Sequence, residues 1–135
     1  MFSQVFSDKI AEDGSRMIVT HTNLLGIMEG PQIFYGLYDY ITPEDVDNYE
    51  IYLRLPPSYK KSISKGRKLL LKFEDDTIME LESNEFHSAQ SIHHEDVRYN
   101  VKEEDLNKML TVKVIRVRIE NDINYGEVVG PKRFF

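Results

Sequence analysis

The sequence of 135 residues contains no cysteine. This absence excludes disulfide frameworks, thiolate zinc sites, iron–sulfur clusters and cysteine nucleophiles. The 7 glycines are scattered along the chain and form no glycine-rich phosphate loop. The sequence also has no HExxH spacing and no nucleophile elbow. The chain therefore carries none of the short motifs that commonly indicate catalysis.

Long apolar segments are missing as well. No stretch approaches the roughly 20 apolar residues that a membrane-spanning helix requires. Residues 1–8 lack the basic start and the apolar block of a secretory signal. We therefore expect no membrane span and, by default, a cytoplasmic location, or an exported protein if a signal has been removed.

The balance of charge is acidic, with a formal net charge of −6. Contacts with phosphates need Lys and Arg, so the acidity makes nucleic acid an unfavourable partner. Hydrophobic residues make up 41% of the chain, which is enough to support a buried core. Because the length suits one domain, we expect a single domain over residues 1–135.

Strand patterns dominate the chain. Residues 49–55 alternate between apolar and polar side chains, residues 69–81 resemble a hairpin, and residues 111–120 are rich in β-branched side chains. Residues 103–110 begin with three acids and then present an apolar stripe, which predicts a helix. The sequence therefore predicts a mainly β fold, an antiparallel β-sandwich or open barrel, with one short α-helix near residues 103–110 that caps one end of the core.

The turn of the 69–81 hairpin can be predicted from its hydrophobic register. A three-residue loop at residues 75–77 pairs Phe73 with Met79 and Leu71 with Leu81. A two-residue turn would instead set an apolar side chain against a glutamate. The register therefore favours the longer loop.

Three further positions carry local predictions. Residues 42–45 combine a capping hydroxyl, a proline and two acids, which predicts one turn of helix. Gly36, inside an aromatic strand, indicates a bulge or the close approach of a neighbouring backbone. The apolar phase changes at Ile115, which predicts a bulge or a late strand start there.

Tyrosine is the most frequent aromatic residue, with 8 copies. Its apolar ring and polar hydroxyl suit interfaces and ligands, so the candidate contact residues are Tyr35, Tyr38, Tyr52 and Tyr59. The favoured alternative is that most of these rings fill the core. Tyr52 is the exception, because it shares the polar face of its strand with a glutamate and an arginine.

The only cluster of metal-ligand types consists of His87, His93, His94 and Glu95. Histidine and carboxylate side chains can hold zinc with an open position. The two adjacent histidines would point apart in a strand, so a solvated polar loop is the favoured interpretation. We expect no cofactor.

A basic run begins beside Tyr59 and extends to Lys72. Its candidate contacts for an anion are Lys60, Lys61, Lys65 and Arg67. Alternatively, these cations flank a strand as solvent-facing charges, which the acids of residues 74–76 offset.

The second half of the chain has a recognisable order of elements. A strand–acidic turn–strand unit at residues 65–81 is followed by residues 99–101, a helix at 104–110 and a strand at 114–119. This order resembles a group of small, uncharacterised bacterial β-rich proteins. The chain departs from their pattern at the helix cap, where Lys102 replaces a Ser or Thr. The resemblance implies no activity and assigns no functional residue.

Three functions follow as hypotheses. The first is a non-catalytic binding or protein-interaction module, which self-associates through a strand edge or the tyrosine-rich face. The second is a small metal-dependent hydrolase that uses the His87–Glu95 loop. The third is a binder of an anionic partner through Lys60–Lys72. The missing motifs favour the non-catalytic interpretation.

Overall fold

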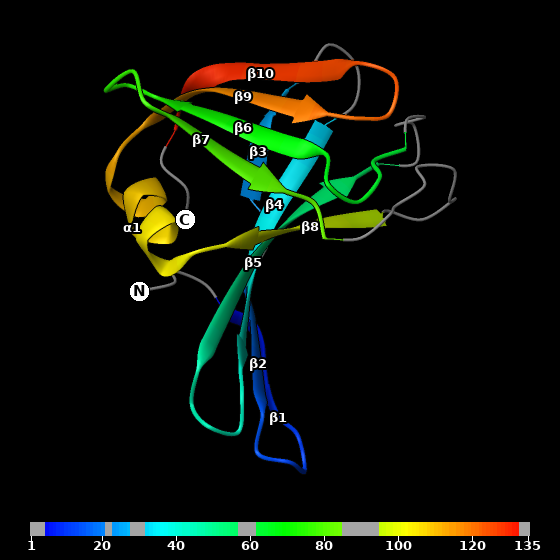
Figure 1. Cartoon of the computed structure of the whole chain (residues 1–135), viewed down its shortest axis with the longest axis vertical. Helices are drawn as coiled ribbons and strands as arrows, with labels where there is room; N and C mark the ends of the chain where they lie inside the picture. Colours follow the sequence, from blue (N-terminus) through cyan, green and yellow to red (C-terminus); the bar gives the residue numbers. More distant parts are fainter. Residues whose placement is uncertain (1–4, 21–22, 28–31, 57–61, 85–94, 133–135) are drawn as a thin grey trace.

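The computed structural model describes residues 5–20, 23–27, 32–56, 62–84 and 95–132 (Figure 1). In these ranges the chain forms β1 (Val5–Ile10), β2 (Arg16–Thr20), β3 (Asn23–Ile27), β4 (Gln32–Ile41), β5 (Asp47–Leu55), β6 (Lys68–Phe73), β7 (Ile78–Glu82), β8 (Glu95–Val101), α1 (Glu103–Thr111), β9 (Val114–Glu120) and β10 (Tyr125–Lys132). No helix in the described ranges is long and apolar enough to cross a membrane.

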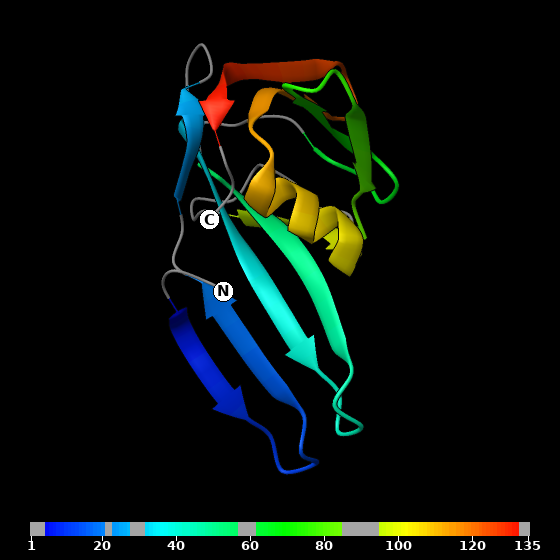
Figure 2. The same cartoon turned by 90° about the vertical axis from the view of Figure 1, so that its left-hand side faces the viewer.

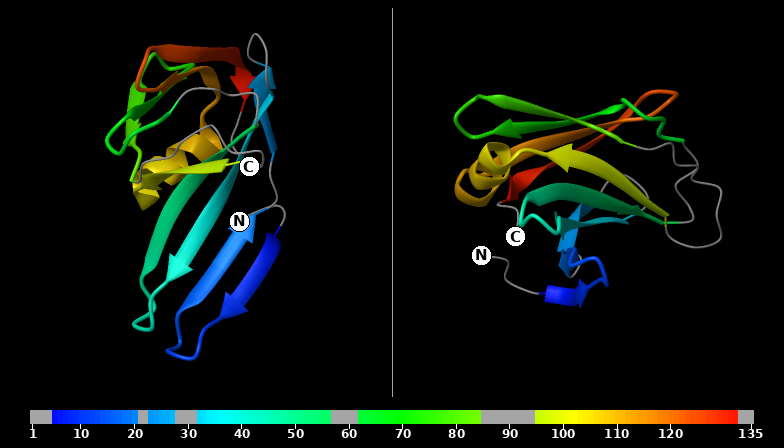
Figure 3. Two further views of the ribbon diagram at one scale, coloured as in Figure 1. Left: turned by 90° about the vertical axis from the view of Figure 1, so that its right-hand side faces the viewer. Right: turned by 60° about the horizontal axis from the view of Figure 1, so that its bottom comes forward.

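The strands form two antiparallel sheets. The larger sheet has the order β1-β2-β4-β5-β8, and β3 pairs with β4 beyond the end of β2. The smaller sheet has the order β10-β9-β6-β7. Figure 3 shows the two layers, with α1 at one end between them. The prediction of a mainly β, sandwich-like fold is confirmed, and the described strands do not close into a barrel.

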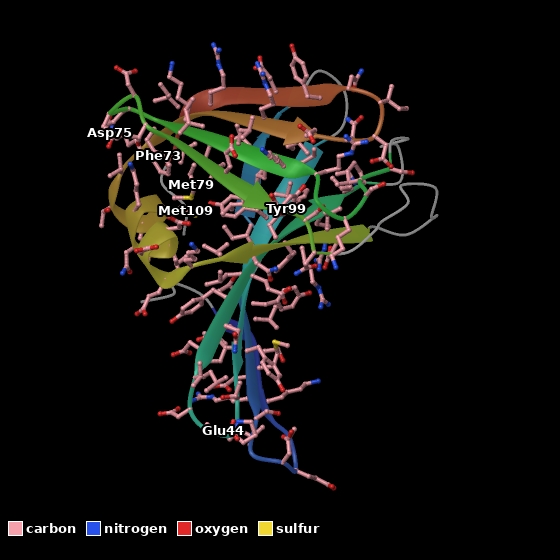
Figure 4. All side chains as sticks on the ribbon, in the orientation of Figure 1. Glu44, Phe73, Asp75, Met79, Tyr99 and Met109 are labelled. Atoms are coloured by element: carbon pink, nitrogen blue, oxygen red, sulfur yellow. The ribbon has the colours of Figure 1, made fainter. Side chains whose placement is uncertain are left out.

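The core lies between the two sheets and continues to the helix. Alternate residues of β6 and β7 are buried, as expected for strands that cover a core with one face. Leu106 and Met109 of α1 belong to the same buried cluster as Phe73 and Met79 (Figure 4). The prediction that the helix caps the core is therefore confirmed, and Lys102 provides no side-chain cap.

The β6–β7 hairpin has a three-residue loop, but the loop lies one residue earlier than predicted. Leu71 pairs with Met79 and Leu69 with Leu81, while the backbone of Phe73 bonds to Thr77. The loop therefore comprises residues 74–76, and Asp76 takes a left-handed conformation with φ 68°. This register still sets apolar side chains opposite one another, so the hydrophobic pattern alone could not exclude it.

The prediction of a helical turn at residues 42–45 is wrong. This segment is the turn of the β4–β5 hairpin, with hydrogen bonds from Asp45 N to Thr42 O and from Thr42 N to Val46 O. Asp45 has φ 65°, a left-handed conformation that ends a helix but suits a hairpin loop. Proline and acidic residues are compatible with both structures, and the pairing of the flanking strands decides between them.

The predicted irregularity at Ile115 is confirmed as a bulge. Phe73 pairs with Val114 while Lys72 pairs with Arg116, so Ile115 is the extra residue. At Gly36 the prediction of a bulge is wrong, because the β4–β5 register continues through it.

The larger sheet extends past the smaller one as a protrusion that we call the arm (Figure 2). It consists of β1, β2, residues 38–41 of β4, the turn at 42–46 and residues 47–50 of β5. Figure 1 shows that the two hairpin turns of the arm lie farthest from the smaller sheet. One face of the arm continues the core-facing side of the sandwich, and we call it the inner face.

Candidate functional site

The predicted metal cluster lies almost entirely outside the described residues. His87, His93 and His94 fall outside them, and for Glu95 the structure gives the backbone pairing with Leu55. In the described parts of the chain, no group of three or more His, Asp and Glu side chains could hold a metal ion. The metal hypothesis therefore stays a prediction.

The basic run does not act as one patch in the described region. Lys60 and Lys61 lie outside the described residues, and Lys65 is exposed in the turn before β6. The Arg67 guanidinium lies 2.8 Å from Asp122 and 3.7 Å from Glu120. Arg67 thus has carboxylate partners within the protein, which compete with any external anion.

The four candidate tyrosines have different environments. Tyr35 is buried in the core, Tyr38 is half-buried and Tyr59 lies outside the described residues. Tyr52 does share a face with Glu50 and Arg54, as predicted, but it is only 1% exposed. The expectation that Tyr52 is the exception to burial is therefore wrong.

The burial of Tyr52 has a local cause. Its ring lies over Gly36, the residue opposite it on β4, where an added Cβ would come within 2.2 Å of the ring. The hydroxyl donates a hydrogen bond of 3.0 Å to the carbonyl of Thr20 on β2. Burial raises the pKa of Tyr52 to about 12. The absent side chain of Gly36 thus leaves space for the ring of Tyr52, whereas the sequence indicated the close approach of a neighbouring backbone.

A charged and aromatic cluster surrounds this ring on the outer face of the larger sheet. Tyr38 packs on Tyr52 with ring centroids 4.6 Å apart, and the Arg98 guanidinium lies 4.7 Å from the Tyr38 centroid. Arg54 donates two hydrogen bonds to Asp96, of 2.9 and 3.0 Å. These contacts link β4, β5 and β8. Tyr38 and Tyr52 thus contribute contacts between neighbouring strands. This favours a structural role for the two tyrosines over a role in a ligand site.

The inner face of the arm holds a pair of carboxyl groups that the sequence analysis did not single out. Asp39, near the end of β4, is 5% exposed, and its Oδ1 atom is buried without a hydrogen-bond partner. Its carboxyl group interacts with that of Asp47, which lies diagonally across on β5. Burial, followed by the hydrogen bond and the negative charge of Asp47, raises the pKa of Asp39 to about 7. The sequence does indicate that Asp39 faces the core side, because it follows Tyr35 and Leu37 at alternate positions of the same strand.

An open groove runs between the arm and the beginning of α1. Its volume is about 390 Å³, and its lining consists of Asp47, Asn48, Tyr49, Asn100, Val101, Lys102 and Glu103. Burial and the charges of Asp39, Asp47 and Glu103 raise the pKa of Tyr49. Asp39 is not one of the described lining residues, but its carboxyl group interacts with Asp47 and Tyr49, which are.

Comparison with known proteins adds no further assignment. No family, curated protein or solved structure matches this chain.

The contact between Gly36 and Tyr52 gives a first testable prediction. Gly36→Ala is expected to lower the free energy of unfolding by about 2–3 kcal/mol, because the ring must move out of a packed position. Urea unfolding measures this change. In a Tyr52→Ala background the same substitution should be close to neutral; an equal loss in both backgrounds would contradict the explanation.

The raised pKa of Asp39 predicts how stability depends on pH. Between its unfolded pKa of about 4 and its folded pKa of about 7, the folded protein binds the extra proton. Stability therefore falls as the pH rises from about 4 to about 7 and stays low above it. Asp39→Asn cannot ionise, so it should flatten this decline and raise the stability at about pH 8 relative to the unsubstituted protein.

Urea unfolding at about pH 5 and pH 8 tests this prediction. Asp8→Asn is the matched control, because Asp8 lies on the same face of the arm but pairs with Arg16. The hydrogen bond with Arg16 lowers the pKa of Asp8, so Asp8→Asn should not produce the same flattening. An unchanged pH dependence in Asp39→Asn would show that Asp39 is not the responsible group.

Proposed function

We propose that the protein is a non-catalytic protein-interaction module that self-associates through its arm. The observation that carries the proposal is that β1 forms an edge of the larger sheet in a part of the molecule that the smaller sheet does not cover (Figure 2). An edge strand presents backbone donors and acceptors to any strand that approaches it. Pairing with the β1 strand of a second copy would extend the sheet across the two molecules.

The side chains of the arm support this role. Ile10, at the end of β1, is 73% exposed, and Val46, in the turn between β4 and β5, is 55% exposed. Val5 and Tyr40 add exposed apolar surface to the same sheet. An interface needs such surface because apolar burial supplies most of the favourable free energy of association.

The charges of β1 are compatible with pairing between copies. Asp8 and Lys9 point to opposite faces of β1, so two antiparallel β1 strands cannot set one opposite the other; a register that sets Ser7 opposite Ser7 keeps each charge away from its like counterpart. A lysine at an edge can also discourage pairing, so a six-residue strand with these charges should form a weak, concentration-dependent dimer.

The oligomeric state tests the proposal, and the chain offers a matched control. Ile10→Lys should shift the protein toward monomer, because it places a charge in the apolar contact. Ile123→Lys alters a residue of almost the same exposure, 74%, in the turn before β10, and should leave the association unchanged. Sedimentation velocity over about a hundredfold range of concentration measures both variants.

Two results would contradict self-association through the arm. One is a strict monomer at every concentration of the unsubstituted protein. The other is an equal effect of Ile10→Lys and Ile123→Lys, which would locate the contact elsewhere or make it nonspecific. Melting temperatures of the two variants should agree closely with that of the unsubstituted protein, since both positions are largely exposed.

A further inference from the structure

The outer face of the smaller sheet contains a hollow that is independent of the arm. Its volume is about 200 Å³, and its lining comprises Leu70, Lys72, Ile78, Arg116, Arg118 and Glu127. These residues come from all four strands of the sheet, β6, β7, β9 and β10. The strand pairing explains their proximity, because Lys72 pairs with both Ile78 and Arg116, and Arg118 pairs with both Leu70 and Glu127.

The lining has an excess of positive charge. Arg118 donates a hydrogen bond of 2.7 Å to Glu127, which lowers the pKa of that glutamate and neutralises one cation. Neither Lys72 nor Arg116 takes part in an ion pair among the described residues. Among the described lining residues, three cations and one anion thus leave two positive charges in a protein whose net charge is −6.

The placement of Lys72 opposite Arg116 is unfavourable for an isolated sheet. Like charges directly opposite each other on one face of a sheet repel and destabilise the pairing. A bound anion would reverse this effect, because both cations would then face an opposite charge. The arginine fork matches a carboxylate or phosphate group, and the lysine adds a mobile point charge.

The apolar part of the lining restricts the class of anion further. Ile78 is 64% exposed beside Lys72, and Leu70 is half-buried beside Arg118. Tyr125 lies next to this area, with the Arg118 guanidinium 4.2 Å from its ring centroid. Apolar side chains beside cations suit a ligand that has both an anionic group and a short hydrocarbon chain.

We infer that this hollow binds small organic acids, with the carboxylate held by Lys72 and Arg116 and the hydrocarbon chain against Leu70 and Ile78. The hollow is smaller than the roughly 300–1,000 Å³ of most ligand pockets, so the ligand is small. Its affinity should accordingly be modest, with a Kd on the order of 1 mM. Of the predicted basic contacts, neither Lys65 nor Arg67 lines the hollow, and Lys60 and Lys61 lie outside the described residues.

NMR titration of the backbone amides with hexanoate, acetate and inorganic phosphate tests this inference. Hexanoate should bind at least about fivefold more tightly than acetate, because its longer chain removes apolar surface from water. Shifts should concentrate on β6 and β9. If phosphate or acetate binds as tightly as hexanoate, the apolar side chains contribute nothing and the proposed class of ligand is wrong.

Two variants and one control locate the contact. Arg116→Gln and Lys72→Gln should each weaken hexanoate binding by about tenfold, because each removes a charge-assisted contact. Lys65→Gln removes an equal charge from an exposed turn outside the hollow and should leave the affinity unchanged. Equal weakening in all three variants would indicate a general charge effect and would overturn the assignment. The absence of saturable shifts with hexanoate would overturn it as well.

Two measurements together distinguish failure of the hollow as a binding site from failure of self-association. Sedimentation in the presence of hexanoate reports on the arm, and the amide shifts report on the hollow. Loss of self-association with retained hexanoate binding would contradict the first proposal alone, and the reverse result would contradict the second alone.

Discussion

The continuous pairing of β4 with β5 is the constraint on which the rest of the structure depends. It runs from Phe34 opposite Arg54 to Ile41 opposite Asp47, through both the sandwich and the arm. In the sandwich, the core-facing side of this ladder packs against the smaller sheet and is apolar. Beyond the smaller sheet none of the described strands forms a second layer on this side, and Asp39 takes the position in the alternation that an apolar residue holds before it. The length of one hairpin thus creates both the core and an uncovered surface.

Much of the fold could be predicted because it depends on local periodicity. The alternation at residues 49–55 and 69–81 predicts strands, of which β6 and β7 have one buried face, and the apolar stripe of residues 103–110 gives the helix. The change of phase at Ile115 is also local, and it gives the bulge. The prediction failed at residues 42–45, where a helix cap and a hairpin turn require the same residue types. Only the pairing of distant strands distinguishes the two.

The candidate sites were harder to predict because they combine residues that are far apart in the sequence. Tyr52 occupies a polar phase of its strand, yet it is buried because the residue opposite it is a glycine. The cations of the hollow come from β6 and β9, which lie on either side of α1 in the sequence. The alternation of Arg116 and Arg118 with apolar residues was visible, but its meaning depended on the pairing with Lys72. The sequence shows which residues are charged, whereas the strand pairing shows which of them lie opposite one another.

The two proposed surfaces impose different symmetries on any assembly. Pairing of β1 with β1 uses the same surface on both copies, so it is isologous and ends with a dimer. Contact between the acidic groove, with Asp47 and Glu103, and the cationic hollow, with Lys72 and Arg116, would use different surfaces. Such a head-to-tail contact does not close on itself unless the rotation between copies forms a ring. A species that stops at two copies therefore favours the strand edge, whereas growth beyond two copies would favour the attraction between groove and hollow. Added salt also distinguishes the two contacts. It should weaken the attraction between groove and hollow, which depends on exposed charges, more than strand pairing that buries Ile10.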